Sequence, residues 1–168
     1  MAHIVRHWAD LIAASRLSEW LQDHLWVVPA SQSVHIAAVS VLFAAAVFIS
    51  FRLLHADARA RPVPELIPTL IPWMRGALAV LLITGIVQTI AEPVRQFVTP
   101  AFWSKMLMIV IVMALTEWFA RSVRTHVERW DDAAHRPAAR LFAVTSVTLW
   151  VLIIFCGRFI GYTWERYA

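Results

Sequence analysis

The sequence predicts an all-α integral membrane protein, a four-helix bundle preceded by an N-terminal amphipathic interfacial helix. Of its 168 residues, 60% are apolar and 15% are charged, whereas soluble domains have about 45–50% and about 25%. Four long apolar windows alternate with short polar segments. This pattern argues against a soluble enzyme, a disordered chain and a nucleic-acid-binding domain. The single cysteine, Cys156, excludes an intrachain disulfide and a cysteine-based zinc site.

Residues 1–30 form the first predicted unit. Apolar residues recur near helical spacing from Trp8 to Leu25, and charged residues lie between them. The segment is too polar to span a bilayer and lacks the continuous apolar core of a signal peptide. We therefore expect an amphipathic helix in the outer membrane interface, ended by Pro29. An ordinary capping helix packed on the bundle is an equal alternative, and the two placements are compatible.

Residues 31–168 form the second unit, the transmembrane bundle. Its four windows, near 34–54, 71–91, 102–120 and 141–162, each supply the ~20 apolar residues of a spanning helix. Backbone groups in lipid must be hydrogen-bonded within the segment, which favours helices. Prolines punctuate the connections, and we assign the four between positions 62 and 72 to the first one. Thr99 and Pro100 match the N-cap and first residue of the third helix.

The basic residues predict the orientation in the membrane. Nine lie in or beside the first and third connections, and only Arg95 and Lys105 lie in or beside the second. The positive-inside rule then places the first and third connections in the cytoplasm. We expect a multi-pass protein of the bacterial inner membrane with both termini in the periplasm. The basic excess partly reflects this topology, so nucleic acid is not an expected partner.

Polar residues inside the spans are costly and are therefore the best candidates for a site. Near the outer surface, helical spacing puts a histidine, two cations, an amide and a phenol at similar depth. An imidazole that binds iron, with cations and a phenol toward the propionates, suits a b-type haem. The candidate cofactor residues are His35, with its imidazole as the metal ligand, Lys105, Arg158, Gln88 and Tyr162.

His35 is the only histidine inside a predicted span, which limits the haem hypothesis. Two histidines of one bundle cannot hold the iron. The iron would be five-coordinate, or take a non-histidine second ligand, or receive His35 from another subunit. The structural alternative is that His35 hydrogen-bonds a neighbouring helix or a headgroup and binds no cofactor.

Near the inner surface, the expected arrangement is structural. Glu117 and Arg121 are spaced i, i+4 and predict a local ion pair. Arg52 and Arg75 end their spans at the anionic leaflet, where their side chains can snorkel. The alternative is an Arg52–Glu117–Arg75 cluster that locks the bundle or forms part of a proton path.

Two weaker patterns are also present. Met106 and Met113 share a face of the third helix, and thioethers together with His35 suit Cu(I). Ordinary packing is the favoured interpretation of these methionines. Gly157 and Gly161 form a GxxxG pair that permits close helix approach, within the bundle or between subunits.

The polar positions also carry a resemblance to known families. The shared pattern comprises His35, Arg52, Trp73, Gly76, Thr84, Gly85 and Lys105, with Gly157 and Arg158 late in the fourth helix. In this pattern the chain, from about 20 to 162, resembles a family of small four-helix bacterial membrane proteins of unknown function. That family is similar to CopD-type copper-resistance domains and, more distantly, to HemJ-type protoporphyrinogen oxidases. The HemJ likeness implies haem binding and redox chemistry at His35 and Lys105, and the CopD likeness implies copper handling or transport.

These observations leave three hypotheses for function. The leading one is a small b-haem-binding or redox-associated membrane protein, acting alone or as the membrane subunit of an electron-transfer complex. The second is a cofactor-free accessory or structural subunit that binds a partner or lipid through its tryptophan-rich outer face. The third is a copper-handling or transport protein. A homo-oligomer or larger membrane complex fits each of them, and whether the protein is an enzyme stays open.

Overall fold

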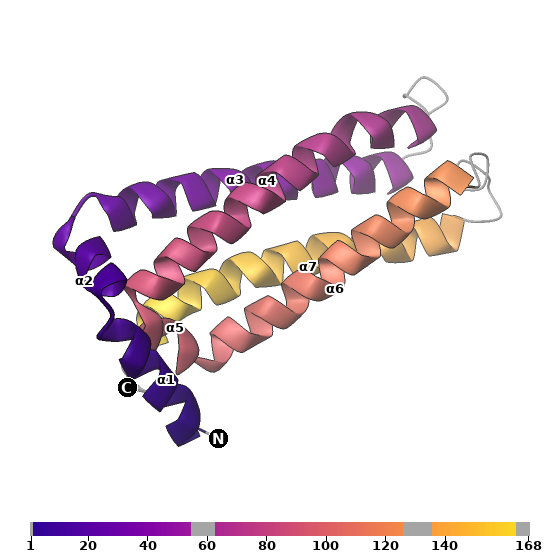
Figure 1. The fold of residues 1–168 in the computed structure, drawn as a ribbon. Coiled ribbons are helices and arrows are strands. Elements are labelled where there is room, and N and C mark those ends of the chain that lie inside the picture. Colours follow the sequence, from indigo (N-terminus) through magenta and orange to yellow (C-terminus); the bar gives the residue numbers. More distant parts are fainter. Residues whose placement is uncertain (1, 55–62, 126–135, 164–168) are drawn as a thin grey trace.

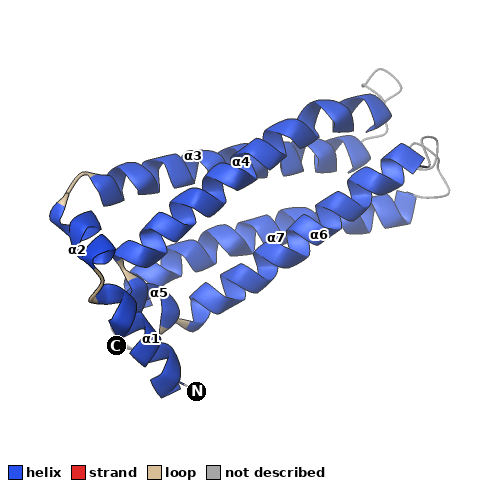
Figure 2. Cartoon of the chain, viewed as in Figure 1, coloured by secondary structure: helices blue, strands red, loops and turns tan. Residues whose placement is uncertain are grey.

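The chain folds into helices, and the computed structural model describes residues 2–54, 63–125 and 136–163 with no strand in these ranges (Figures 1 and 2). Four of the described helices are long and apolar enough to cross a membrane, which confirms the predicted all-α, multi-pass membrane bundle. The elements are α1 (Ala2–Ala13), α2 (Arg16–Asp23), α3 (Val27–Leu54), α4 (Val63–Ala91), α5 (Pro93–Phe97), α6 (Pro100–Thr125) and α7 (Arg136–Thr163).

The four long helices form a ring in the order α4, α3, α7, α6 (Figure 1). Packing is close between α3 and α4, between α3 and α7, and between α6 and α7, whereas α4 and α6 contact each other more loosely. We call their shared boundary the α4–α6 seam. The short helices α1, α2 and α5 lie at the end where α7 finishes, here called the terminal end; the other end of the bundle is the opposite end.

Small side chains let α3 pack against two neighbours. Ala38, Ala45 and Ala46 are buried on the same face as Leu42, the face expected to continue from His35. Since lipid tails are as apolar as the core, helices in a membrane associate through close packing and interhelical hydrogen bonds rather than the hydrophobic effect. One such bond runs from the Ser50 hydroxyl to the Ala143 carbonyl on α7, at 3.2 Å.

The start of α4 differs from the expectation. The helix begins at Val63, so Pro68 and Pro72 lie inside it rather than in the connection before it. A proline removes one backbone N–H and usually kinks a helix. These two are four residues apart and exposed, so the missing donors fall on one outer face, and the buried face of Ile67, Ile71 and Met74 stays continuous.

The N-terminal segment also differs from the single helix that we expected. Two helices, α1 and α2, replace it, because the Ser15 hydroxyl accepts a hydrogen bond from Ser18 N–H and caps α2. Pro29 does not end a helix; it lies in the first turn of α3, where its missing N–H has no intrahelical partner anyway. Ala9, Ser18 and Leu21 are buried, and α1 and α2 pack on α4 and α5. The capping arrangement is therefore present.

The third span begins as expected. Helix α6 starts at Pro100, directly after Thr99. The Thr99 hydroxyl donates back to the Arg95 carbonyl at 2.8 Å, and the Thr99 carbonyl accepts from Phe102 N–H at 3.0 Å. These bonds join α5 to α6 in a tight corner and place the first turn of α6 beside the end of α4.

Candidate functional site

A cavity of about 380 Å³ lies at the terminal end of the α4–α6 seam. Helices α4 and α6 form most of its wall, α3 contributes His35, and residues of α1 and α5 cover it toward the terminal end. The lining is mainly apolar, as in most ligand sites. Its polar members are His35, Gln88, Thr89, Gln96 and Lys105. Three of the five predicted cofactor residues are thus brought together.

The cavity extends to the outer surface of the bundle. Leu82 and Ile86 both line it and are 52% and 59% exposed. They belong to a helix apolar enough to span a membrane, so this side faces lipid. On the terminal side, Ile12 of α1 and Phe97 of α5 line it. The exposed lining residues lie on α4, beside the α4–α6 seam.

His35 is held by a hydrogen bond across the α3–α4 interface. Its Nδ1 lies 2.8 Å from the Thr84 hydroxyl. That hydroxyl has one proton, and two carbonyls of its own helix accept from it: Val80 at 2.8 Å and Leu81 at 3.2 Å. We infer that Thr84 accepts from His35, so that Nδ1 carries the proton of a neutral imidazole.

This arrangement leaves the other ring nitrogen as an acceptor. His35 Nε2 is buried and has no hydrogen-bond partner among the described residues. A histidine that ligates a metal typically donates from one nitrogen to a fixed neighbour and binds with the other. The ring lies beside Gly85, where an added Cβ atom would be 3.6 Å from His35 Cε1. The bond to Thr84 therefore holds the imidazole in an orientation that leaves Nε2 as a buried acceptor.

Lys105 brings a cation to the same cavity from α6. The end of its side chain lies against α7, since a Cβ atom on Gly157 would be 3.6 Å from Lys105 Nζ. In an apolar surrounding a single cation attracts an anionic group, so Lys105 suits a carboxylate or another acidic substituent.

Gln88 contributes a second unpartnered group. Its Nε2 atom is buried without a hydrogen-bond partner in the described part of the chain. Native proteins leave few buried polar groups unsatisfied, and each one calls for an explanation. Together with His35 Nε2, it gives the cavity an unused donor and an unused acceptor.

Arg158 and Tyr162 are not brought to the cavity. Both side chains are exposed on α7, and the Arg158 guanidinium donates to the Tyr162 hydroxyl and lies over its ring. Gly157 faces Lys105, and the next residue on a helix points about 100° away. The roles expected of Arg158 and Tyr162 toward a haem thus remain predictions without support from the cavity.

Met106 also lines the cavity, which bears on the copper hypothesis. A thioether and the free His35 nitrogen are ligands that Cu(I) accepts. No group of three or more histidine, cysteine or acidic side chains with metal-binding geometry is found in the described ranges. Of the two methionines in the predicted copper pattern, Met106 lines the cavity and Met113 does not.

The atoms nearest to the two glycines of the GxxxG pair belong to side chains, not to the backbone of a neighbouring helix. Gly157 faces the end of Lys105, and a Cβ atom on Gly161 would lie 3.2 Å from Arg95 Nη2. Arg95 in turn pairs with Glu92 at 2.6 Å. The two glycines leave room for cations of α5 and α6 at the terminal end.

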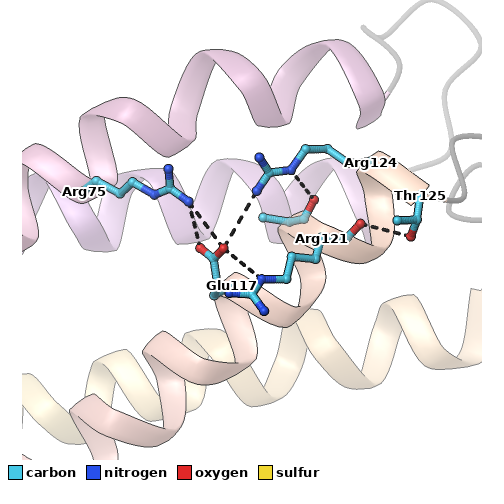
Figure 3. Close-up of polar contacts among 6 residues, drawn as sticks. Arg75, Glu117, Arg121, Arg124 and Thr125 are labelled. Atoms are coloured by element: carbon cyan, nitrogen blue, oxygen red, sulfur yellow. Dashed lines mark hydrogen bonds and ion pairs between the residues drawn. The ribbon is translucent and has the colours of Figure 1, made fainter.

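A second polar cluster lies at the opposite end of the α4–α6 seam (Figure 3). Arg75 of α4 reaches Glu117 of α6 at 3.0 Å, and Arg121 reaches it at 3.1 Å, which confirms the predicted local ion pair. Arg124 approaches at 3.8 Å. Of the alternative Arg52–Glu117–Arg75 cluster, the contact between Arg75 and Glu117 forms. Arg124, which the sequence argument missed, follows Glu117 by seven residues on the same helix face.

Three polar residues at the site were not predicted from the sequence, and little in their sequence context identifies them. Thr89 and Gln96 line the cavity, and Thr84 holds His35. Thr84 is a polar residue inside the second predicted span. Pairing it with His35 was therefore possible in principle, whereas Gln96 depends on the corner made by α5.

A comparison with known protein families identifies the family of this chain. Residues 25–163 match DUF6644, a family of unknown function. The chain belongs to this family. No curated protein and no solved structure matches the chain. The expected membership in a family of unknown function is therefore confirmed, and the likeness to CopD-type and HemJ-type proteins stays a prediction.

The DUF6644 region contains nearly the whole cavity. It begins before α3 and ends with α7. Every cavity-lining residue except Ile12 of α1 falls inside it. The cavity of this chain is therefore built almost entirely by the matched region, and α1 contributes one further lining residue, Ile12.

Proposed function

We propose that this DUF6644 protein binds a b-type haem or a related flat redox cofactor in the cavity of the α4–α6 seam. The observation that carries the proposal is the buried, unpartnered Nε2 of His35, with Nδ1 bonded to Thr84 at 2.8 Å. His35 would be the iron ligand, and bound haem supplies one-electron chemistry. The protein would act alone or as the membrane subunit of an electron-transfer complex.

The remaining lining residues fit such a cofactor. Lys105 offers a cation to an acidic substituent, and Gln88 offers amide donors. The apolar wall excludes water from the imidazole. At about 380 Å³ the cavity lies at the small end of ligand sites, and the lateral opening beside Leu82 and Ile86 supplies further room. Met106 is a candidate for a second, non-histidine ligand; a five-coordinate iron and His35 of another subunit are the alternatives.

The visible spectrum of detergent-purified protein, expressed with a haem supply, tests the proposal. We expect a Soret band that is lost or strongly shifted in His35→Ala. His7→Ala is the matched control, because His7 is exposed on α1 away from the cavity. Absence of the band in the wild-type protein rejects the haem proposal, and a band that survives His35→Ala unchanged rejects the ligand assignment.

The same preparation separates the alternatives. Copper at a stoichiometric level by elemental analysis, without a Soret band, supports a copper-handling protein that uses His35 and Met106. A preparation without metal or chromophore that co-purifies with another protein supports an accessory or structural subunit. A homo-oligomer would be seen as a larger mass in size-exclusion chromatography with light scattering.

We also propose the orientation that the basic residues predict, in a bacterial inner membrane with both termini in the periplasm. The arrangement supports it, since α1 and the end of α7 lie at one end of the bundle (Figure 1). Thr125→Cys and Leu25→Cys place thiols at the opposite and terminal ends. Labelling of intact cells by a membrane-impermeant thiol reagent should reach position 25 only, and the reverse pattern rejects the orientation.

A further inference from the structure

The cluster at the opposite end of the α4–α6 seam has more positive than negative charge. Glu117 is the one carboxylate in it, and three guanidiniums surround it: Arg75 at 3.0 Å, Arg121 at 3.1 Å and Arg124 at 3.8 Å. If the carboxylate is ionised, two positive charges are left without a counter-ion among these four residues. A bound anion would balance them.

The guanidiniums are accessible to such an anion. The Arg75, Arg121 and Arg124 side chains are 57%, 74% and 56% exposed. Each uses a single nitrogen atom toward Glu117: Nη2, Nε and Nη2 respectively. A guanidinium carries five N–H donors in a planar fork that matches two phosphate oxygens. Donors therefore remain on side chains that already converge from α4 and α6 (Figure 3).

The surroundings of the cluster are those of a membrane–water boundary. Both helices that carry it are apolar enough to span a membrane. Trp73 and Trp118, close in sequence to Arg75 and Glu117, are 71% and 55% exposed. Tryptophan is enriched at the headgroup level, and arginine side chains are long enough to reach that level from within a span. A phosphate held here would belong to a lipid with its chains along the seam.

We propose that Arg75, Arg121 and Arg124 form a binding site for the phosphate group of an anionic glycerophospholipid, at the opposite end of the α4–α6 seam. The lipid headgroup serves as the missing counter-ion beside Glu117. Arginine forks bind phosphate oxygens through charge-assisted hydrogen bonds. This site is separate from the cavity at the terminal end and does not depend on cofactor binding there.

The experiment measures lipid binding by the purified full-length protein in a non-ionic detergent. Phosphatidylglycerol is titrated while the thermal unfolding midpoint is followed, and phosphatidylcholine serves as the zwitterionic reference. We expect stabilisation by phosphatidylglycerol well above that by phosphatidylcholine. A basic residue near the anionic surface contributes enough for a roughly fivefold change in affinity, so Arg121→Gln should weaken binding about fivefold. Arg121→Gln/Arg124→Gln should weaken it about 25-fold.

Two controls distinguish a site from general attraction. Arg140→Gln removes an exposed cation from the first turns of α7, at the same end of the bundle but outside the cluster. It should leave the affinity within about twofold of wild type. If it weakens binding as much as Arg121→Gln does, the site is rejected in favour of general attraction by the basic surface.

Glu117→Gln tests the counter-ion argument in the opposite direction and guards against variants that fail to fold. Without the carboxylate, three positive charges face the lipid, so phosphatidylglycerol should bind about fivefold tighter. Weaker binding by a folded Glu117→Gln protein overturns the proposal. Inorganic phosphate at millimolar concentration provides the last arm: if it stabilises the protein as phosphatidylglycerol does, the anion is not a lipid and the proposal fails.

Discussion

The α4–α6 seam has polar side chains at both ends, and the two ends differ in how these side chains are satisfied. At the opposite end, Glu117 contacts three exposed guanidiniums. At the terminal end, His35 and Gln88 keep buried nitrogen atoms without partners beside a cavity that Lys105 also lines. Exposed ion pairs cost little and contribute little, whereas buried unpaired polar groups are costly.

This difference indicates separate roles for the two ends. An exposed cluster of ion pairs with an excess of positive charge suits the membrane surface, where it can join two helices and meet headgroups. A buried set with unused hydrogen-bonding capacity suits a ligand, because the ligand can supply the missing partners. The looser packing of α4 against α6 accommodates both, since it leaves room for the cavity and for the Arg75 side chain, which bridges the two helices.

The largest expected effect concerns the bond that orients His35. Thr84→Val removes the hydroxyl that accepts from Nδ1, and loss of such a partner typically lowers metal affinity 10–100-fold. Haem titration followed at the Soret band should show this loss. Thr84→Ser should restore most of the affinity. Thr89→Val is the control, because Thr89 lines the same cavity but its hydroxyl bonds to Gly85; an equal loss there would contradict the orienting role.

The next prediction tests whether buried polar groups at the terminal end lack hydrogen-bond partners when no ligand is bound. Gln88→Leu removes the unpartnered buried amide nitrogen, so the ligand-free protein should gain about 1–2 kcal/mol of unfolding free energy. Denaturant titration followed by tryptophan fluorescence measures it. Thr89→Val should gain less, because its hydroxyl already has a partner. Destabilisation by Gln88→Leu would mean that the amide has a structural role.

A smaller effect is expected at the opposite end. Glu117→Gln removes the acceptor of three exposed pairs, each worth about 0.2–1 kcal/mol, so unfolding free energy should fall by about 1 kcal/mol at low salt. Measured without anionic lipid, the difference should shrink at high salt because salt screens exposed charges. Glu92→Gln, which removes one pair with Arg95, should lose less. A salt-independent loss would argue against an electrostatic contribution.

The smallest effect tests how the glycines of α7 are used. An added methyl group at Gly157 would contact Lys105 Nζ at an ordinary 3.6 Å, and alanine is a better helix former than glycine by about 1 kcal/mol. Gly157→Ala should therefore be neutral or stabilising by up to about 1 kcal/mol in thermal unfolding. Gly161→Ala should gain less, because Arg95 must move. Marked destabilisation of Gly157→Ala would favour close backbone packing there.

The long helices differ in how well the sequence predicts which side chains face the bundle. Small and polar residues favour the inward face of a membrane helix, and the structure buries Ala38 on α3 and Thr84 on α4. Helix α7 carries Arg158 and the small residue Gly157 at the same depth, so depth alone did not identify which of the two faces the bundle. The expectation for Arg158 failed to find support for that reason, since its neighbour Gly157 faces Lys105 instead.

The sequence by itself determined the all-α class, the four spans, and the depth of each polar residue, because length, apolar content and helical rise depend only on the local chain. It also determined the Glu117–Arg121 pair, which lies within one helix. Only the tertiary structure decided that His35 meets Thr84, that Gln88 and Lys105 share its cavity, and that Arg75 crosses to Glu117. Those contacts depend on how the helices are rotated and packed, and in a membrane that information comes from the fit between neighbouring side chains.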